Sequence, residues 1–77
     1  MNSSELKAAM ARNNDTQERL AEFLGLQTSG VSARISGKID FRRSEINKIR
    51  ERYNLTDKET IIIFFDDKVS EEDTKGA

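Results

Sequence analysis

Apolar residues recur along this chain at the three- and four-residue spacing that is typical of short amphipathic helices. Leu6, Ala9 and Met10 follow this spacing, and Asn2 with Glu5 has the spacing of a capping box at the start of the same helix. Proline is absent and glycine occurs only four times, so few positions would interrupt helices. We predict an all-α bundle of about five short helices, over about residues 3–13, 17–24, 28–36 and 43–53 and from Thr56 onward.

Residues 16–38 have the features of two short helices joined by a tight turn. Thr16 is suited to cap the first helix, although Asp15 with Glu18 offers a competing capping box one residue earlier. Gly25 follows this helix at the point where a left-handed residue can end it and turn the chain. The expected apolar stripes consist of Leu20, Ala21 and Leu24 in the first helix and of Val31 and Ile35 in the second.

In this segment the chain resembles the Cro and repressor class of phage helix-turn-helix regulators. The residues that carry the resemblance are Thr16-Gln17, Leu20-Ala21, Leu24-Gly25, Val31-Ser32 and Gly37-Lys38. A narrower resemblance, to small Cro-like regulators of phages of Gram-positive bacteria, continues through Ser32–Lys38, Phe41, Ser44–Ile46, Ile49, Leu55-Thr56, Glu59 and Phe64-Phe65. It implies one DNA-binding domain over residues 1–65, which occupies an operator as a homodimer in the cytoplasm of a bacterial host. Two positions depart from the family pattern: Gln27 stands where Ser or Thr is common, and Arg34 where an apolar core residue is common.

The resemblance also assigns DNA contacts to these two helices. It implies that Gln17 donates to a phosphate at the start of the first helix, while the start of the second helix faces base edges in the major groove. Arg34 has two alternative contacts, a guanine or a phosphate, and Gly30 either lets DNA approach the backbone or only weakens the helix. The residues expected to contact DNA are Gln17, Gln27, Thr28, Ser29, Ser32, Arg34, Lys38, Arg42 and Arg43.

The distribution of charge is more informative than its sum. The chain carries 13 basic and 14 acidic residues, a net charge of −1. Residues 1–54 hold ten basic and seven acidic residues, a net of +3, whereas residues 55–77 hold three and seven, a net of −4. A basic stripe follows the second motif helix and favours a docking face for a polyanion, the alternative being an ordinary solvated face. This stripe consists of Arg34, Lys38, Arg42 and Arg43.

The run from Ile61 to Phe65 leaves two questions open. Its isoleucines and phenylalanines have high strand propensity, whereas the capping-box spacing of Thr56 and Glu59 and the family resemblance favour a helix. These five consecutive apolar residues either all enter the core or leave some exposed as a protein-binding surface. The residues expected at such a surface are Ile62, Ile63 and Phe65. Residues 66–77 are expected to form a disordered acidic tail.

These features define two function hypotheses. The first is a Cro-like regulator whose partners are double-stranded operator DNA and a second copy of the chain. The second is an antirepressor or modulator that keeps the helix-turn-helix fold and binds a phage repressor protein through the apolar run. Catalysis is not expected, because histidine and cysteine are both absent, and we expect neither a cofactor nor a metal site. No apolar run approaches the roughly 20 residues of a membrane span, so no membrane partner is expected.

Overall fold

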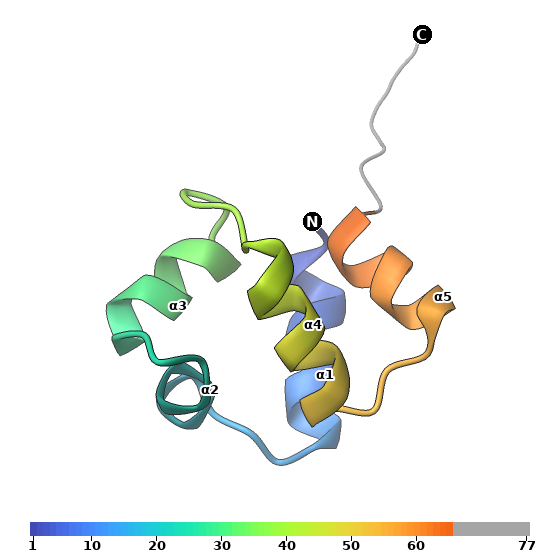
Figure 1. The fold of residues 1–77 in the computed structure, drawn as a ribbon, viewed down its shortest axis with the longest axis horizontal. Helices are drawn as coiled ribbons and strands as arrows, with labels where there is room; N and C mark the ends of the chain where they lie inside the picture. The colour runs from blue at the N-terminus through green and yellow to red at the C-terminus, as the bar shows by residue number, and fades with distance from the viewer. Residues whose placement is uncertain (66–77) are drawn as a thin grey trace, which may run out of the picture.

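The computed structural model describes residues 1–65, and the regular structure in this range is entirely helical (Figure 1). The elements are α1 (Ser3–Arg12), α2 (Gln17–Leu24), α3 (Thr28–Ile35), α4 (Arg43–Arg52), α5 (Asp57–Thr60) and a π-helical turn, η1 (Ile61–Phe65). The first four begin where the sequence predicts and end within one residue of it. The predicted all-α class is confirmed, while the tail predicted for residues 66–77 lies outside the described residues. Among the described helices, none combines the length and hydrophobicity of a bilayer-spanning segment.

Side-chain caps explain where several helices begin. At the start of α2 the Thr16 hydroxyl accepts a hydrogen bond from the Arg19 amide at 3.1 Å. Thr16 therefore caps this helix, and the competing box that begins at Asp15 does not form. At the start of α1, Glu5 N–H donates to Asn2 Oδ1 at 3.2 Å. At the start of α5 the bonds are reciprocal: Glu59 N–H donates to Thr56 Oγ1 at 3.1 Å, and Thr56 N–H donates to Glu59 Oε1 at 2.8 Å.

The turn between α2 and α3 depends on Gly25. Its φ of 73° lies in the left-handed region, where a side chain is strained, and the Leu26 amide then donates to the Ala21 carbonyl at 2.8 Å. Ala21 is only 2 % exposed, so it is buried beneath this turn. The turn folds α3 back on α2, and the two helices contact each other along the molecule's edge (Figure 1).

The core takes a fully buried side chain from each of the four longer helices and from η1. In Figure 1 the α2–α3 pair lies on one side of the molecule and α5 with η1 on the other, with α1 and α4 between them. The segment before α1 is hydrogen-bonded to η1, because the Asn2 amide donates to the Ile63 carbonyl at 2.7 Å. The largest fully buried side chains are Leu6, Leu20, Val31, Ile49 and Ile63, from α1, α2, α3, α4 and η1 respectively.

The run from Ile61 to Phe65 is helical, which answers the question left open by its strand propensity. Ile63 and Phe64 face inward, and the Phe64 ring meets the Phe41 ring edge to face with centroids 5.7 Å apart. The expectation that Ile63 belongs to an exposed surface is therefore wrong, since its side chain is 2 % exposed and one face of the turn must cover the core. Ile61, Ile62 and Phe65 point outward and are 56 %, 36 % and 55 % exposed.

Candidate nucleic-acid interface

The outward face of α3 is small, polar and exposed. Its inner side is held against the core by Val31 and Ile35, which lie one turn apart and are both buried. Gln27 precedes the helix in an extended conformation and makes no side-chain capping bond, so its amide remains on the surface. Four of the residues predicted to face base edges are exposed together at this N-terminal end: Gln27, Thr28, Ser29 and Ser32.

Cationic side chains continue this face beyond α3. Lys38 lies in the loop after the helix, and Arg42 and Arg43 lie at the start of α4; all three are exposed, as predicted. Gln17 is half-buried in the first turn of α2, where backbone N–H groups are not used within the helix. The loop also carries the exposed Asp40, which lies between Lys38 and Arg42 in the sequence.

Arg34 does not belong to this surface, contrary to the prediction. It is 8 % exposed, and each of its three guanidinium nitrogens has a protein acceptor. Nε and Nη2 donate to the two carboxylate oxygens of Glu45 at 3.0 and 3.3 Å, and Nη1 donates to the Gly30 carbonyl at 3.0 Å. The departure from the family pattern at this position was the indication that Arg34 sits on the inner side of α3. With these hydrogen bonds made, the guanidinium cannot also reach DNA.

Glu45 is a functional candidate that sequence reasoning missed. One of its oxygens accepts from the Arg42 amide at 2.9 Å in addition to the bond from Arg34. Burial alone would raise the pKa of Glu45, but the hydrogen bonds from Arg42 and Arg34 outweigh burial and hold the pKa below its ordinary value. Glu45 is therefore an ionised partner for Arg34. Its spacing of three residues from Arg42 is that of the second half of a capping box, which was the available indication.

Gly30 faces the protein rather than the outward face of α3. A Cβ built at this position would lie 3.4 Å from Nη1 of Arg34 and 3.9 Å from Cβ of Leu26. Close approach of DNA to the Gly30 backbone is thus not what this glycine provides. Of the two alternatives, the structure favours the simpler one, a glycine that weakens a helix interior.

A second ionic cluster fixes the start of α2. The Asp15 carboxylate accepts two hydrogen bonds of 2.9 Å from the Arg52 guanidinium, and one each from the Tyr53 hydroxyl and the Thr16 amide. Arg52 in turn lies 4.7 Å from the ring centroid of Phe23, within reach of a cation–π contact. These contacts hold the N-terminal turn of α2, and with it Gln17, against the end of α4.

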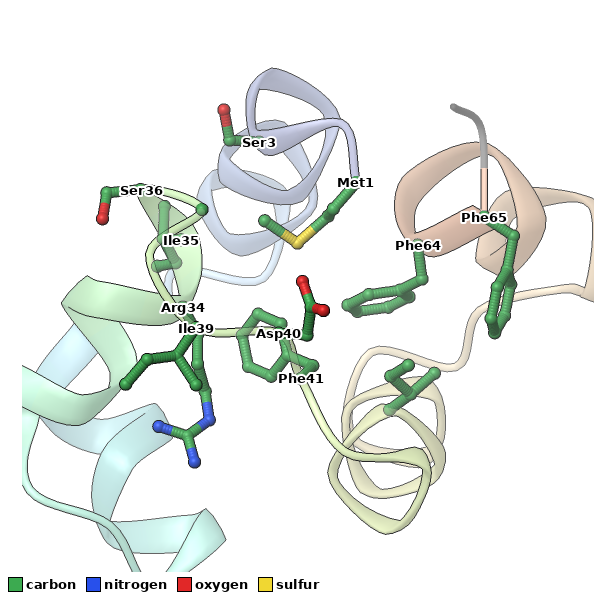
Figure 2. A pocket seen from close by; sticks show the side chains of 12 residues that line it. Met1, Ser3, Arg34, Ile35, Ser36, Ile39, Asp40, Phe41, Phe64 and Phe65 are labelled. Carbon is green, nitrogen blue, oxygen red and sulfur yellow. The ribbon is translucent and has the colours of Figure 1, made fainter. Parts of the chain in front are cut away.

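A hollow of about 450 Å³ lies between the N-terminal segment, the end of α3 with the loop that follows it, and η1 (Figure 2). Figure 2 shows Met1, Asp40, Phe41 and Phe64 around this space, with Phe65 at its edge. Its walls are of mixed character and include the carboxylate of Asp40. Within residues 1–65, no three His, Cys, Asp or Glu side chains converge to hold a metal ion.

Comparison with known proteins returns no match: no protein-family model, no curated protein and no solved structure is similar to this chain. Within residues 1–65, the outward face of α3, flanked by Lys38, Arg42 and Arg43, combines exposed hydrogen-bonding side chains with a local excess of positive charge.

Proposed function

We propose that this protein is a sequence-specific, Cro-like DNA-binding transcription regulator that occupies an operator in the cytoplasm of a bacterial host. In this proposal α2 and α3 act as a helix-turn-helix, with α3 in the major groove. The observation that carries it is the arrangement of α3, whose apolar side is fully used by the core while its exposed side holds Gln27, Thr28, Ser29 and Ser32. An amide and three hydroxyls are groups that can bond to base edges.

The cations beside α3 support the same proposal. Lys38, Arg42 and Arg43 are exposed and carry no ion pair within the described residues, so they are available to phosphates. Phosphate contacts of this kind position a protein on the duplex and supply much of its affinity, although they carry no sequence information. The net charge of +3 over residues 1–54 favours approach to DNA despite the overall charge of −1.

The reading surface is small, which favours action as a homodimer. With Arg34 withdrawn into the protein, Gln27 is the one long side chain at this end of α3 that can pair with a base in bidentate fashion, a contact worth about 1–3 kcal/mol of discrimination. Two copies on half-sites about one helical turn apart would double the number of base contacts. We expect weak binding by a monomer and specific binding by a dimer.

Fluorescence anisotropy on a labelled duplex at several salt concentrations tests the docking face. The variants Lys38→Ala and Arg42→Ala are expected to weaken binding and to reduce the slope of log affinity against log salt by about 0.9 for each lost phosphate contact. Lys58→Ala is the matched control, because Lys58 is exposed on α5, on the other side of the molecule (Figure 1). Equal effects of all three substitutions would contradict docking through α3.

A second candidate function is binding to a repressor protein as an antirepressor or modulator. The observation that favours it is the exposed side of the last turn, where Ile61, Ile62 and Phe65 lie together in sequence with exposed fractions of 56 %, 36 % and 55 %. The same surface is available to a second copy of this chain. Ile62→Ser with Phe65→Ser should abolish either association and leave the fold intact, since neither side chain is buried. Retained association in that variant, measured by sedimentation, would exclude this surface.

A further inference from the structure

We propose that the buried pair of Arg34 and Glu45 is a positioning device that fixes α3 relative to the start of α4, and that specific DNA recognition depends on it. This inference rests on the proposed function. Arg34 and Glu45 do not contact DNA in this proposal. They lie between the base-facing side chains of α3 and the cations proposed to contact phosphates.

The end of α3 and the residue before α4 are both hydrogen-bonded to one carboxylate, that of Glu45. Oε1 of Glu45 accepts from Arg34 Nε at 3.0 Å and from the Arg42 amide at 2.9 Å, and Oε2 accepts from Arg34 Nη2 at 3.3 Å. Arg34 belongs to the last turn of α3, and α3 is the helix that carries the proposed base-facing residues. Arg42 is the residue before α4, and its side chain is exposed. A single buried carboxylate therefore holds together the end of α3 and the backbone of Arg42, one of the cations proposed to contact phosphates.

The loop between these two points is fixed at both ends. On the α3 side, the Lys38 and Ile39 amides both donate to the Ala33 carbonyl, at 2.9 and 3.3 Å. On the α4 side, Glu45 holds the Arg42 amide, and Phe41 packs on Phe64. Lys38 is thus tied to the end of α3 and Arg42 to the start of α4, and Arg34 with Glu45 is the ion pair that joins these two ends of the loop.

Stability alone is a poor explanation for the pair. The two side chains are 9 % and 8 % exposed, so both charges have lost most of their water. The cost of removing water from two charges offsets much of their attraction, and apolar residues of similar size often replace such pairs without loss of stability. A bidentate guanidinium–carboxylate contact does, however, impose a defined direction, which an apolar contact does not. That geometric property is the one a reading helix requires.

The test compares the parent chain with the double variant Arg34→Met/Glu45→Leu, which replaces the pair by apolar side chains. The readouts are the thermal midpoint by circular dichroism and the ratio of affinities for a duplex selected from a random pool and a scrambled duplex of the same composition. We expect a midpoint lowered by no more than the loss of the capping bond from the Arg42 amide to Glu45 explains, unchanged binding to the scrambled duplex, and about tenfold weaker binding to the selected one, comparable to one lost bidentate base contact. The control is Arg50→Met/Asp57→Leu, which removes an exposed ion pair and should leave the ratio unchanged.

Arg34→Lys serves if the double variant does not fold, because it keeps the charge and removes the bidentate geometry. We expect the same fall in the affinity ratio, whereas a folded variant with the parent's ratio overturns the positioning role. A merely structural role of the pair would lower the thermal midpoint and the affinities for both duplexes together. That result also overturns the positioning role. If the parent does not discriminate between the duplexes, the proposed function itself fails; discrimination by the parent and equally by the variants rejects only the role of the pair.

Discussion

Asp15 and Arg52, which are 37 positions apart in the chain, are joined by two hydrogen bonds of 2.9 Å between carboxylate and guanidinium. The Asp15 side chain is 4 % exposed, and Tyr53 also donates to it. The pair links the turn before α2 to the last turn of α4. It is therefore the contact that fixes one end of the proposed helix-turn-helix on the rest of the bundle.

The stability of the fold should depend on the ionisation of Asp15. The hydrogen bonds from Arg52, more than any other cause, lower the pKa of Asp15 from 3.8 to about 2, against the opposing effect of burial. Because the folded-state pKa is the lower one, the stabilisation is complete above the unfolded pKa of 3.8 and is lost as the pH falls through about 2. The shift corresponds to about 2 kcal/mol in the free energy of unfolding. Urea denaturation at a series of pH values measures it.

Asp15→Asn isolates this contribution. The variant should be less stable than the parent by about 2 kcal/mol at pH 7, and the difference should disappear near pH 2. Asp57→Asn is the control, because Asp57 pairs with Arg50 on the surface with its side chain 79 % exposed, where ion pairs are worth less than about 1 kcal/mol. Equal losses in the two variants would show that Asp15 has no special role.

Two glycines should respond to alanine with opposite signs. Gly25→Ala places a side chain at a φ of 73° and should destabilise the fold by about 1 kcal/mol, although nothing lies within 4 Å of the new Cβ. Gly30→Ala fills a helix interior with no contact closer than 3.4 Å and should stabilise the fold by about 0.5–1 kcal/mol. Thermal unfolding of the two variants measures both effects. A loss of stability in Gly30→Ala would mean that the Arg34 side chain cannot accommodate the methyl group.

The sequence predicts the helices well because their ends are set by neighbours in the chain. Thr16 bonds to an amide three residues ahead, and Gly25 needs only its own backbone freedom, so both are visible from spacing. Arg34 was misassigned because its partner, Glu45, lies 11 residues away and is brought close only by the packing of α3 on α4. Ile63 was misassigned because five apolar neighbours give no period, and only the rotation of the last turn decides which of them face inward.

The last turn offers a matched pair of substitutions that tests this rotation. Ile63→Ala should lower the free energy of unfolding by about 2–5 kcal/mol, because its side chain is 2 % exposed and its removal leaves a cavity. Ile62→Ala, at 36 % exposed, should change it by less than about 1 kcal/mol. Chemical denaturation of both variants under identical conditions compares them. A larger loss in Ile62→Ala would place the wrong face of the turn against the core.

Selection from a random pool of duplex DNA at near-physiological salt, followed by sequencing of the retained molecules, tests most directly whether α3 reads DNA. We predict a two-fold symmetric motif with half-sites about one helical turn apart, as expected for a homodimer. The same selection with Gln27→Ala should relax the preference at one base in each half-site, since this residue is the proposed bidentate reader. Retention that depends on salt but yields no motif would contradict sequence-specific regulation by this chain.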